Sequence, residues 1–199
     1  MLFEVAEKTV NDCQREIKLL SIGDKILQKM EKLDPANHQI ITYDHAVACL
    51  HKRGKKFRYG KSLSTSDEKE LTKANNNSFV WVKYIPCSAE GFPFKRKADQ
   101  PNLAMVCDLI APDGYAEILG TAEKITDYNE LLERMAEKGK DAPEQLERYQ
   151  DYLNLRKYGL PEHGGIGMGI ERAVRYLLDL SHVRYTRPFP IVHGTKVNF

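Results

Sequence analysis

The sequence lacks a long apolar run and a cysteine pattern that would staple a small fold. None of its apolar segments approaches the roughly 20 residues of a transmembrane helix. Residues 1–8 contain no long apolar stretch, so we expect no signal peptide. The four cysteines show no Cys-x-x-Cys spacing, which predicts free, mostly buried thiols in a cytoplasmic protein. The motifs GxSxG and HExxH are also absent, and with them the usual signatures of serine hydrolases and zinc proteases.

The 199 residues are enough for one domain with its own core, and we treat 1–199 as a single domain. The net charge of +2 does not mark a nucleic-acid-binding protein. Cationic residues are nevertheless concentrated in 51–61, which holds six Lys or Arg and no acidic residue. This run could contact phosphates. The interpretation that we favour is a solvated helix end and loop.

Helical and extended patterns alternate in the first part of the chain. Apolar residues recur with a 3.6-residue period over 3–34, and the segment 34–37 ends this predicted helix. A short strand over 40–42 precedes a second helix that begins at Tyr43. A polar helical turn follows, for which Ser66 is the expected N-cap.

Strand patterns dominate the middle of the chain. Residues 79–84 are rich in β-formers, and 103–111 is almost continuously apolar, which is typical of a strand covered on both faces. Pro112, Asp113 and Gly114 predict a turn into a further strand, 115–120. With helices on both sides in sequence, these strands predict an α+β fold.

Three further helices are predicted after the strands. Asp127 is the expected N-cap of a helix that ends at Gly139, with Glu130 completing a capping box. A second helix spans about 141–158. The third follows a glycine-rich segment and carries the full i, i+3, i+4, i+7 apolar pattern over 170–178.

The glycine-rich segment 164–172, GGIGMGIER, is the strongest candidate for a binding site. Alternate glycines on a strand clear one face of side chains, so that a flat group can lie against the backbone. Arg172 could stack on an aromatic base and still reach a phosphate. The alternative is a glycine-rich turn with close helix–strand packing. His163, next to this segment, either contacts a ligand or only hydrogen-bonds within its loop.

Two acidic residues on neighbouring predicted strands form a second candidate site. Asp108 is the only charge in its apolar strand, where a carboxylate is costly unless it is paired or bound to a cation. A loop of two or four residues would place Asp108 directly opposite Glu117, whereas a three-residue loop with a bulge at Gly114 would point them to opposite faces. The functional interpretation needs the first register, with Mg²⁺ between the carboxylates. The alternative is one structural salt bridge for each.

Residues 158–190 resemble the third signature motif of class II aminoacyl-tRNA synthetases, in the asparaginyl/aspartyl branch. Further blocks of that branch follow in the same order, so that the resemblance covers about three quarters of the chain. These blocks are 41–50, 83–86, 93–94, 107–120 and 152–159. The resemblance implies the C-terminal part of a class II synthetase catalytic domain, an α+β fold with an antiparallel sheet flanked by helices.

The resemblance also implies a nucleotide site. Arg172 matches the arginine that stacks on the adenine of ATP, with Gly167 and Gly169 beneath the base. Glu171 matches the acidic residue just before that arginine. The family's reaction is adenylation, in which the carboxylate of an amino acid attacks the α-phosphate of ATP.

A metal site and an amino-acid site are implied in the same way. Glu117 matches a carboxylate that holds Mg²⁺ on the phosphates, and Asp108 matches an acidic residue of the same pocket. His163 matches a histidine near the bound amino acid. Lys124 stands where the family usually has the arginine that reads the amino-acid side chain. Ala116 stands where the family often has glycine.

The first two motifs of the family are not matched by the residues before 41, and no anticodon-binding domain is expected. The implied function is therefore ATP-dependent adenylation of asparagine or aspartate and tRNA aminoacylation, as a homodimer or paired with a chain that carries those motifs. One alternative is a paralogue related to archaeal asparagine synthetase that amidates an aspartyl-adenylate. The other is a non-catalytic paralogue that binds nucleotide or a partner protein. No membrane association is expected.

Overall fold

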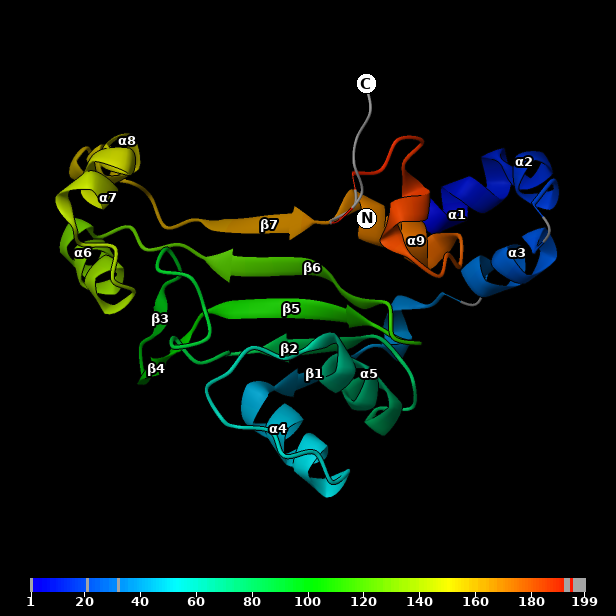
Figure 1. Ribbon diagram of the computed structural model, residues 1–199, viewed down its shortest axis with the longest axis horizontal. Helices are drawn as coiled ribbons and strands as arrows, with labels where there is room; N and C mark the ends of the chain where they lie inside the picture. Colours follow the sequence, from blue (N-terminus) through cyan, green and yellow to red (C-terminus); the bar gives the residue numbers. More distant parts are fainter. Residues whose placement is uncertain (1, 21, 32, 192–193, 195–199) are drawn as a thin grey trace. The chain divides into compact units, whose positions relative to one another are not determined.

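The computed structural model describes residues 2–20, 22–31, 33–191 and 194 (Figure 1). The chain forms two compact units, one made of residues 1–38 and 168–199 and the other of residues 39–167. Within the described ranges, no helix is long and apolar enough to cross a membrane.

The first unit consists of helices that pack through apolar faces. Its elements are α1 (Leu2–Asp12), α2 (Gln14–Lys18), α3 (Gly23–Glu31), η1 (Pro35–Asn37), α9 (Ile170–Leu177) and η2 (Val183–Thr186). The single helix predicted over 3–34 is wrong, because the chain turns before α3. At this turn a side chain on Gly23 would lie 2.2 Å from the carbonyl oxygen of Ile17, so only glycine fits.

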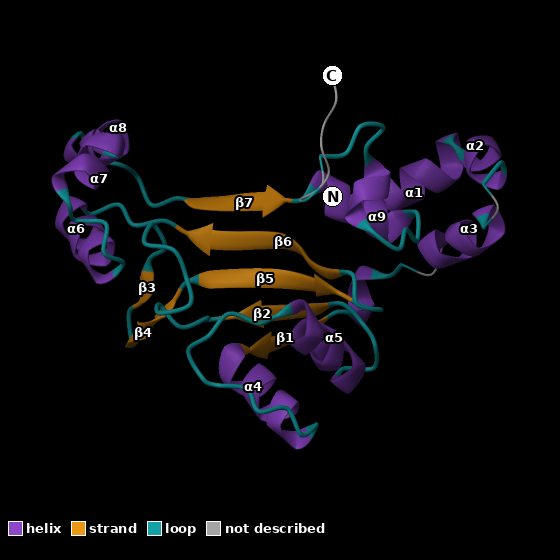
Figure 2. Cartoon of the chain, in the orientation of Figure 1, coloured by secondary structure: helices purple, strands orange, loops and turns teal. Residues whose placement is uncertain are grey.

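The second unit is built on a sheet with the strand order β1-β2-β5-β6-β7 (Figures 1 and 2). The strands are β1 (Gln39–Thr42), β2 (Val80–Lys83), β5 (Val106–Ala111), β6 (Ala116–Glu123) and β7 (Gly164–Met168). The pairs β2/β5 and β5/β6 are antiparallel, as predicted, whereas β1 runs parallel to β2. The predicted strand 103–111 is divided, because β4 (Gln100–Ala104) pairs separately with β3 (Arg96–Lys97).

The second unit also contains five helices within its described residues. They are α4 (Tyr43–Lys52), α5 (Thr65–Ala74), α6 (Tyr128–Glu137), α7 (Pro143–Arg148) and α8 (Gln150–Lys157). Asp127 caps α6 as predicted, by accepting a hydrogen bond from the Glu130 backbone. The cap of α5 is Ser64 rather than Ser66, and it forms a capping box with Asp67. The predicted helix 141–158 is interrupted at Tyr149.

Two apolar clusters hold the second unit together. One lies between the sheet and the helices α4 and α5; its fully buried members include Tyr43, Leu71, Val80 and Val82. The other joins α6 and α8 around Ile125, Leu131, Met135 and Leu153. The thiols do not form disulfides, but only Cys87 is buried and Cys13 is exposed, so the expected burial of most of them is wrong.

The basic run 51–61 forms the end of α4 and the loop that follows it, as the second interpretation predicted. Two of its cations pair with acidic residues of α5. Arg53 binds Glu70 at 2.8 Å, and Lys55 lies 3.5 Å from Asp67. These contacts give part of the run a structural role.

Candidate active site

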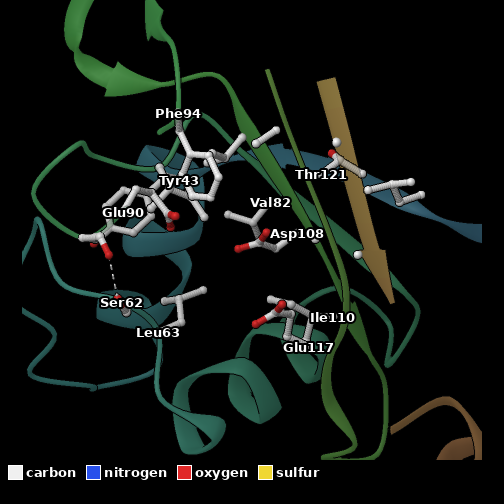
Figure 3. A pocket seen from close by; sticks show the side chains of 18 of the residues that line it. Tyr43, Ser62, Leu63, Val82, Glu90, Phe94, Asp108, Ile110, Glu117 and Thr121 are labelled. Atoms are coloured by element: carbon white, nitrogen blue, oxygen red, sulfur yellow. Dashed lines mark hydrogen bonds between the residues drawn. The ribbon is translucent and has the colours of Figure 1, made fainter. Parts of the chain in front are cut away.

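A pocket of about 610 Å³ lies within the second unit, over the strands β2, β5 and β6 (Figure 3). The helices α4 and α5, two loops and the glycines of β7 complete its wall. Its charged lining residues are Glu68, Glu90, Asp108, Glu117 and Lys124. Lys124 is therefore the only cationic side chain among the described residues that line the pocket.

The hairpin between β5 and β6 has a register that the sequence analysis did not anticipate. Its loop has four residues, but Ala111 pairs with Ala116, so Glu117 lies opposite Ile110 and not opposite Asp108. A bulge at Ile118, not at Gly114, then places Gly120 opposite Asp108. The predicted direct pair of carboxylates is wrong.

Both carboxylates nevertheless face the same pocket. A Cβ atom on Gly120 would lie 3.1 Å from Oδ1 of Asp108 and 3.5 Å from Oε1 of Glu117, so both side chains reach over this glycine. Burial raises the pKa of Asp108 to about 7, and the negative charges of Glu117, Glu90 and Glu68 add to the effect. A cation at this position would relieve the repulsion.

The pair fits a magnesium ion that a phosphate helps to bind. Within the described part of the chain, no group of three His, Cys, Asp or Glu side chains is placed to hold a metal ion. Mg²⁺ commonly takes only one or two carboxylates and completes its octahedron with water and substrate phosphates. Asp108 and Glu117 could therefore hold Mg²⁺ on a nucleotide, and would hold it poorly without one.

Lys124 lines the pocket, as its predicted role requires. Its Nζ atom lies 4.2 Å from the centre of the Phe94 ring. Burial lowers the pKa of Lys124, and the nearby charge of Arg156 lowers it further.

His163, the other residue predicted at the amino-acid site, is not among the described residues that line the pocket. Its Nδ1 atom lies 2.9 Å from the carbonyl oxygen of Pro161, which matches the local hydrogen-bonding alternative.

The glycines of β7 serve two purposes. Gly164 is needed for close packing, because a Cβ atom there would lie 3.1 Å from the carbonyl oxygen of Ala122. Gly167 instead leaves open space, since a Cβ atom there would meet no described atom within 4 Å. Gly165 and Gly167 both line the pocket. The strand thus offers the bare surface that the alternating pattern predicted.

Arg172, Glu171 and Gly169 lie in the first unit, at the start of α9. The stem of Arg172 lies against Gly169, where a Cβ atom would be 3.3 Å from Cδ of the arginine. Glu171 pairs with Arg187, whose Nε donates at 2.8 Å, and this ion pair lowers the pKa of Glu171. The structure therefore gives Glu171 an intramolecular partner.

Two pocket residues were missed by the sequence analysis. Glu68 is buried on α5, and Glu90 is half-buried in the loop before β3. The only signal for Glu90 was that it is the sole acidic residue in a segment otherwise rich in cations, 87–97. Glu68 lies on the face of its helix that carries Leu71 and Thr72, which are both fully buried.

A comparison with known families gives a match over almost the whole chain. The family described as tRNA synthetases class II (D, K and N) matches residues 1–193. The chain belongs to this family. The match begins about 40 residues before the first block of the sequence resemblance, so the class II synthetase relationship includes the helices α1, α2 and α3 as well.

Similarity to individual class II synthetases supports this assignment. The asparagine–tRNA ligase of Lactobacillus delbrueckii subsp. bulgaricus is 34% identical, and that of Thermococcus kodakarensis is 35% identical; each alignment covers 94% of this chain and 41% of the relative. The crystal structure of asparaginyl-tRNA synthetase from Pyrococcus horikoshii matches with a TM-score of 0.81 at 30% identity, covering 96% of this chain and 43% of that one. This match confirms the predicted fold class. The chain spans about two fifths of the length of these relatives.

Proposed function

We propose that this protein binds ATP, Mg²⁺ and asparagine and forms the asparaginyl-adenylate, the first step of tRNA aminoacylation. The observation that carries the proposal is the convergence of Asp108 and Glu117 over Gly120 in a pocket bordered by bare glycine backbone. A related structure supports the choice of amino acid: the Pyrococcus horikoshii synthetase complexed with asparaginyl-adenylate matches with a TM-score of 0.81 at 29% identity, covering 97% of this chain and 42% of that one.

Each site residue then has a defined task. Asp108 and Glu117 would hold Mg²⁺, which screens the charge of the phosphates and orients them. The sequence resemblance assigns Gly167 and Gly169 to the adenine and Arg172 to stacking on it, and Gly167 leaves open space for such a group. Lys124 supplies positive charge in the amino-acid part of the pocket. Adenylation needs positioning and charge screening more than covalent help, and these residues supply both.

Binding of ATP·Mg²⁺ to the purified 199-residue chain tests the nucleotide site. We expect weak binding by isothermal titration calorimetry, lost in Arg172→Ala. Stacking of a cation on an aromatic ring is worth about 0.5–2 kcal/mol, so the loss should be about 3- to 30-fold or more. Arg58→Ala is the matched control, because it removes an exposed arginine outside the proposed site. Equal affinity of wild type and Arg172→Ala would refute the assigned role of Arg172.

The full reaction is tested by exchange of pyrophosphate with ATP. We expect exchange that depends on asparagine and not on aspartate, once the segments that carry the family's first two motifs are supplied. We propose that a paired chain carries these segments, that the protein otherwise forms a homodimer, and that tRNA is the acceptor. Consumption of ammonia with aspartate would instead favour the amidating paralogue. Failure of every amino acid to support exchange would favour the non-catalytic paralogue.

A further inference from the structure

A short loop, residues 87–91, carries Glu90 to the pocket and is held in place by α6. Arg134 of α6 is 1% exposed, and its guanidinium donates hydrogen bonds to the carbonyl oxygens of Cys87 (3.2 Å) and Gly91 (3.4 Å). A buried guanidinium is costly without partners, and Arg134 also pairs with Glu137 at 2.5 Å, while its Nε is left without a hydrogen bond among the described residues. Its contacts on both sides of Glu90 therefore fix the ends of this loop.

Two further side chains hold the middle of the same loop. Lys138, one turn after Arg134, donates to the carbonyl oxygen of Ser88 at 2.8 Å. Ser62, in the loop before α5, donates to the carbonyl oxygen of Ala89 at 3.2 Å. These contacts hold the loop backbone in place, and the carboxylate of Glu90, which accepts a hydrogen bond from the backbone N–H of Gly91, lines the pocket.

Figure 3 shows Glu90 beside the same hollow as Asp108 and Glu117. Burial raises the pKa of Glu90, and so does the charge of Glu117; Lys138 and Arg134 act in the opposite direction. Glu90 is therefore a desolvated acidic group, and the two cations that lower its pKa, Arg134 and Lys138, do not line the pocket.

The pocket offers little positive charge to a further anionic group. Mg²⁺ on Asp108 and Glu117 would offset those two carboxylates. Among the described lining residues, Lys124 would then be the single cation, and its ammonium group already lies over the Phe94 ring. A side-chain carboxylate brought in by a substrate would be repelled by the desolvated carboxylate of Glu90.

We infer that Glu90 selects the side chain of the amino acid, accepting a hydrogen bond from an amide N–H and repelling a carboxylate of the same shape. This inference rests on the proposed function, since it takes the pocket to be the amino-acid site. A site built to hydrogen-bond an N–H group discriminates strongly against an analogue without it, because its own polar group is left without a partner. Glu90 is the specificity-determining residue, and Arg134 positions it.

Two non-hydrolysable adenylate analogues test the inference, one carrying asparagine and one aspartate, with a sulfamoyl group in place of the phosphate. Binding to the full chain is measured by titration calorimetry. We expect wild type to prefer the asparaginyl analogue and Glu90→Gln to reduce this preference about 10- to 100-fold, the value of one charge-assisted hydrogen bond. Glu90→Lys should reverse the preference. Glu133→Gln, which removes an exposed carboxylate of α6, should leave it unchanged.

The outcomes separate the two proposals. An equal loss of both analogues in Glu90→Gln would mean that Glu90 holds the α-ammonium group, and would overturn the assignment to the side chain. An unchanged preference in both Glu90 variants would overturn the role of Glu90 and leave the proposed function in place. If wild type binds neither analogue, the proposed function fails, and the inference fails with it.

Discussion

The buried carboxyl of Asp108 in the pocket should make the free energy of unfolding depend on pH. Its pKa is raised from the ordinary value of 3.8 to about 7, mainly by burial. In the unfolded chain the carboxyl loses its proton near pH 4, whereas in the folded chain it keeps the proton until about pH 7. The folded state therefore binds more protons between these values, and its free energy of unfolding must fall as the pH rises.

The size of the effect follows from the shift. One pKa unit corresponds to about 1.4 kcal/mol, so a shift of about three units is about 4 kcal/mol over the whole range. About a third of this is already lost at pH 5. Asp108→Asn cannot titrate, so its stability relative to wild type should improve by about 2–3 kcal/mol between pH 5 and pH 8.

Urea unfolding at pH 5 and pH 8 measures this difference directly. Asp141→Asn, an exposed aspartate, is the matched control and should show no such change. If the difference between Asp108→Asn and wild type is the same at both pH values, the carboxyl is not desolvated as described. At pH 8, Mg²⁺ with ATP should stabilise wild type more than Asp108→Asn, because the ion would offset the charge that destabilises the site.

Three further substitutions test the framework by urea unfolding. Ala116→Gly should stabilise the fold by up to about 1 kcal/mol, because Ala116 has φ = +68°, a conformation that favours glycine; a loss of stability would contradict this. Asp127→Ala should cost about 1 kcal/mol by removing the cap of α6, and an unchanged midpoint would disprove that role. Arg134→Met should cost about 2–3 kcal/mol, since carbonyl oxygens of the loop would lose their donor; stability equal to wild type would show that the loop does not depend on it.

Patterns confined to neighbouring residues predicted their structures well. Most of the continuous apolar run became β5, a strand with a neighbour on each side, although its first residues belong to β4. The spacing of apolar residues from Ile170 predicted α9, in which Ala173 and Leu177 are buried as expected, whereas Ile170 is exposed. The alternating glycines became β7. These features depend on periodicity and turn chemistry, which are determined by residues close together in the sequence.

Features that depend on distant residues could not be predicted in this way. The turn before α3 depends on how closely Gly23 approaches the backbone of Ile17, which periodicity does not reveal. The placement of Glu90 depends on Arg134, and the hydrogen bonds from Arg134 to the loop span more than 40 positions of sequence. The sequence resemblance identified Asp108 and Glu117, but a resemblance of motifs does not specify strand register.

The register explains why Gly120 matters to the candidate site. If the pairing of Ala111 with Ala116 continued without interruption, Leu119 would lie opposite Asp108, and its side chain would fill the space between the two carboxylates. The bulge at Ile118 pairs Leu119 with Leu109 instead and turns it to the other face, where it is buried. Gly120 then takes the position opposite Asp108 and adds no side chain there. One extra residue in β6 therefore clears the place where a metal ion and a phosphate would bind.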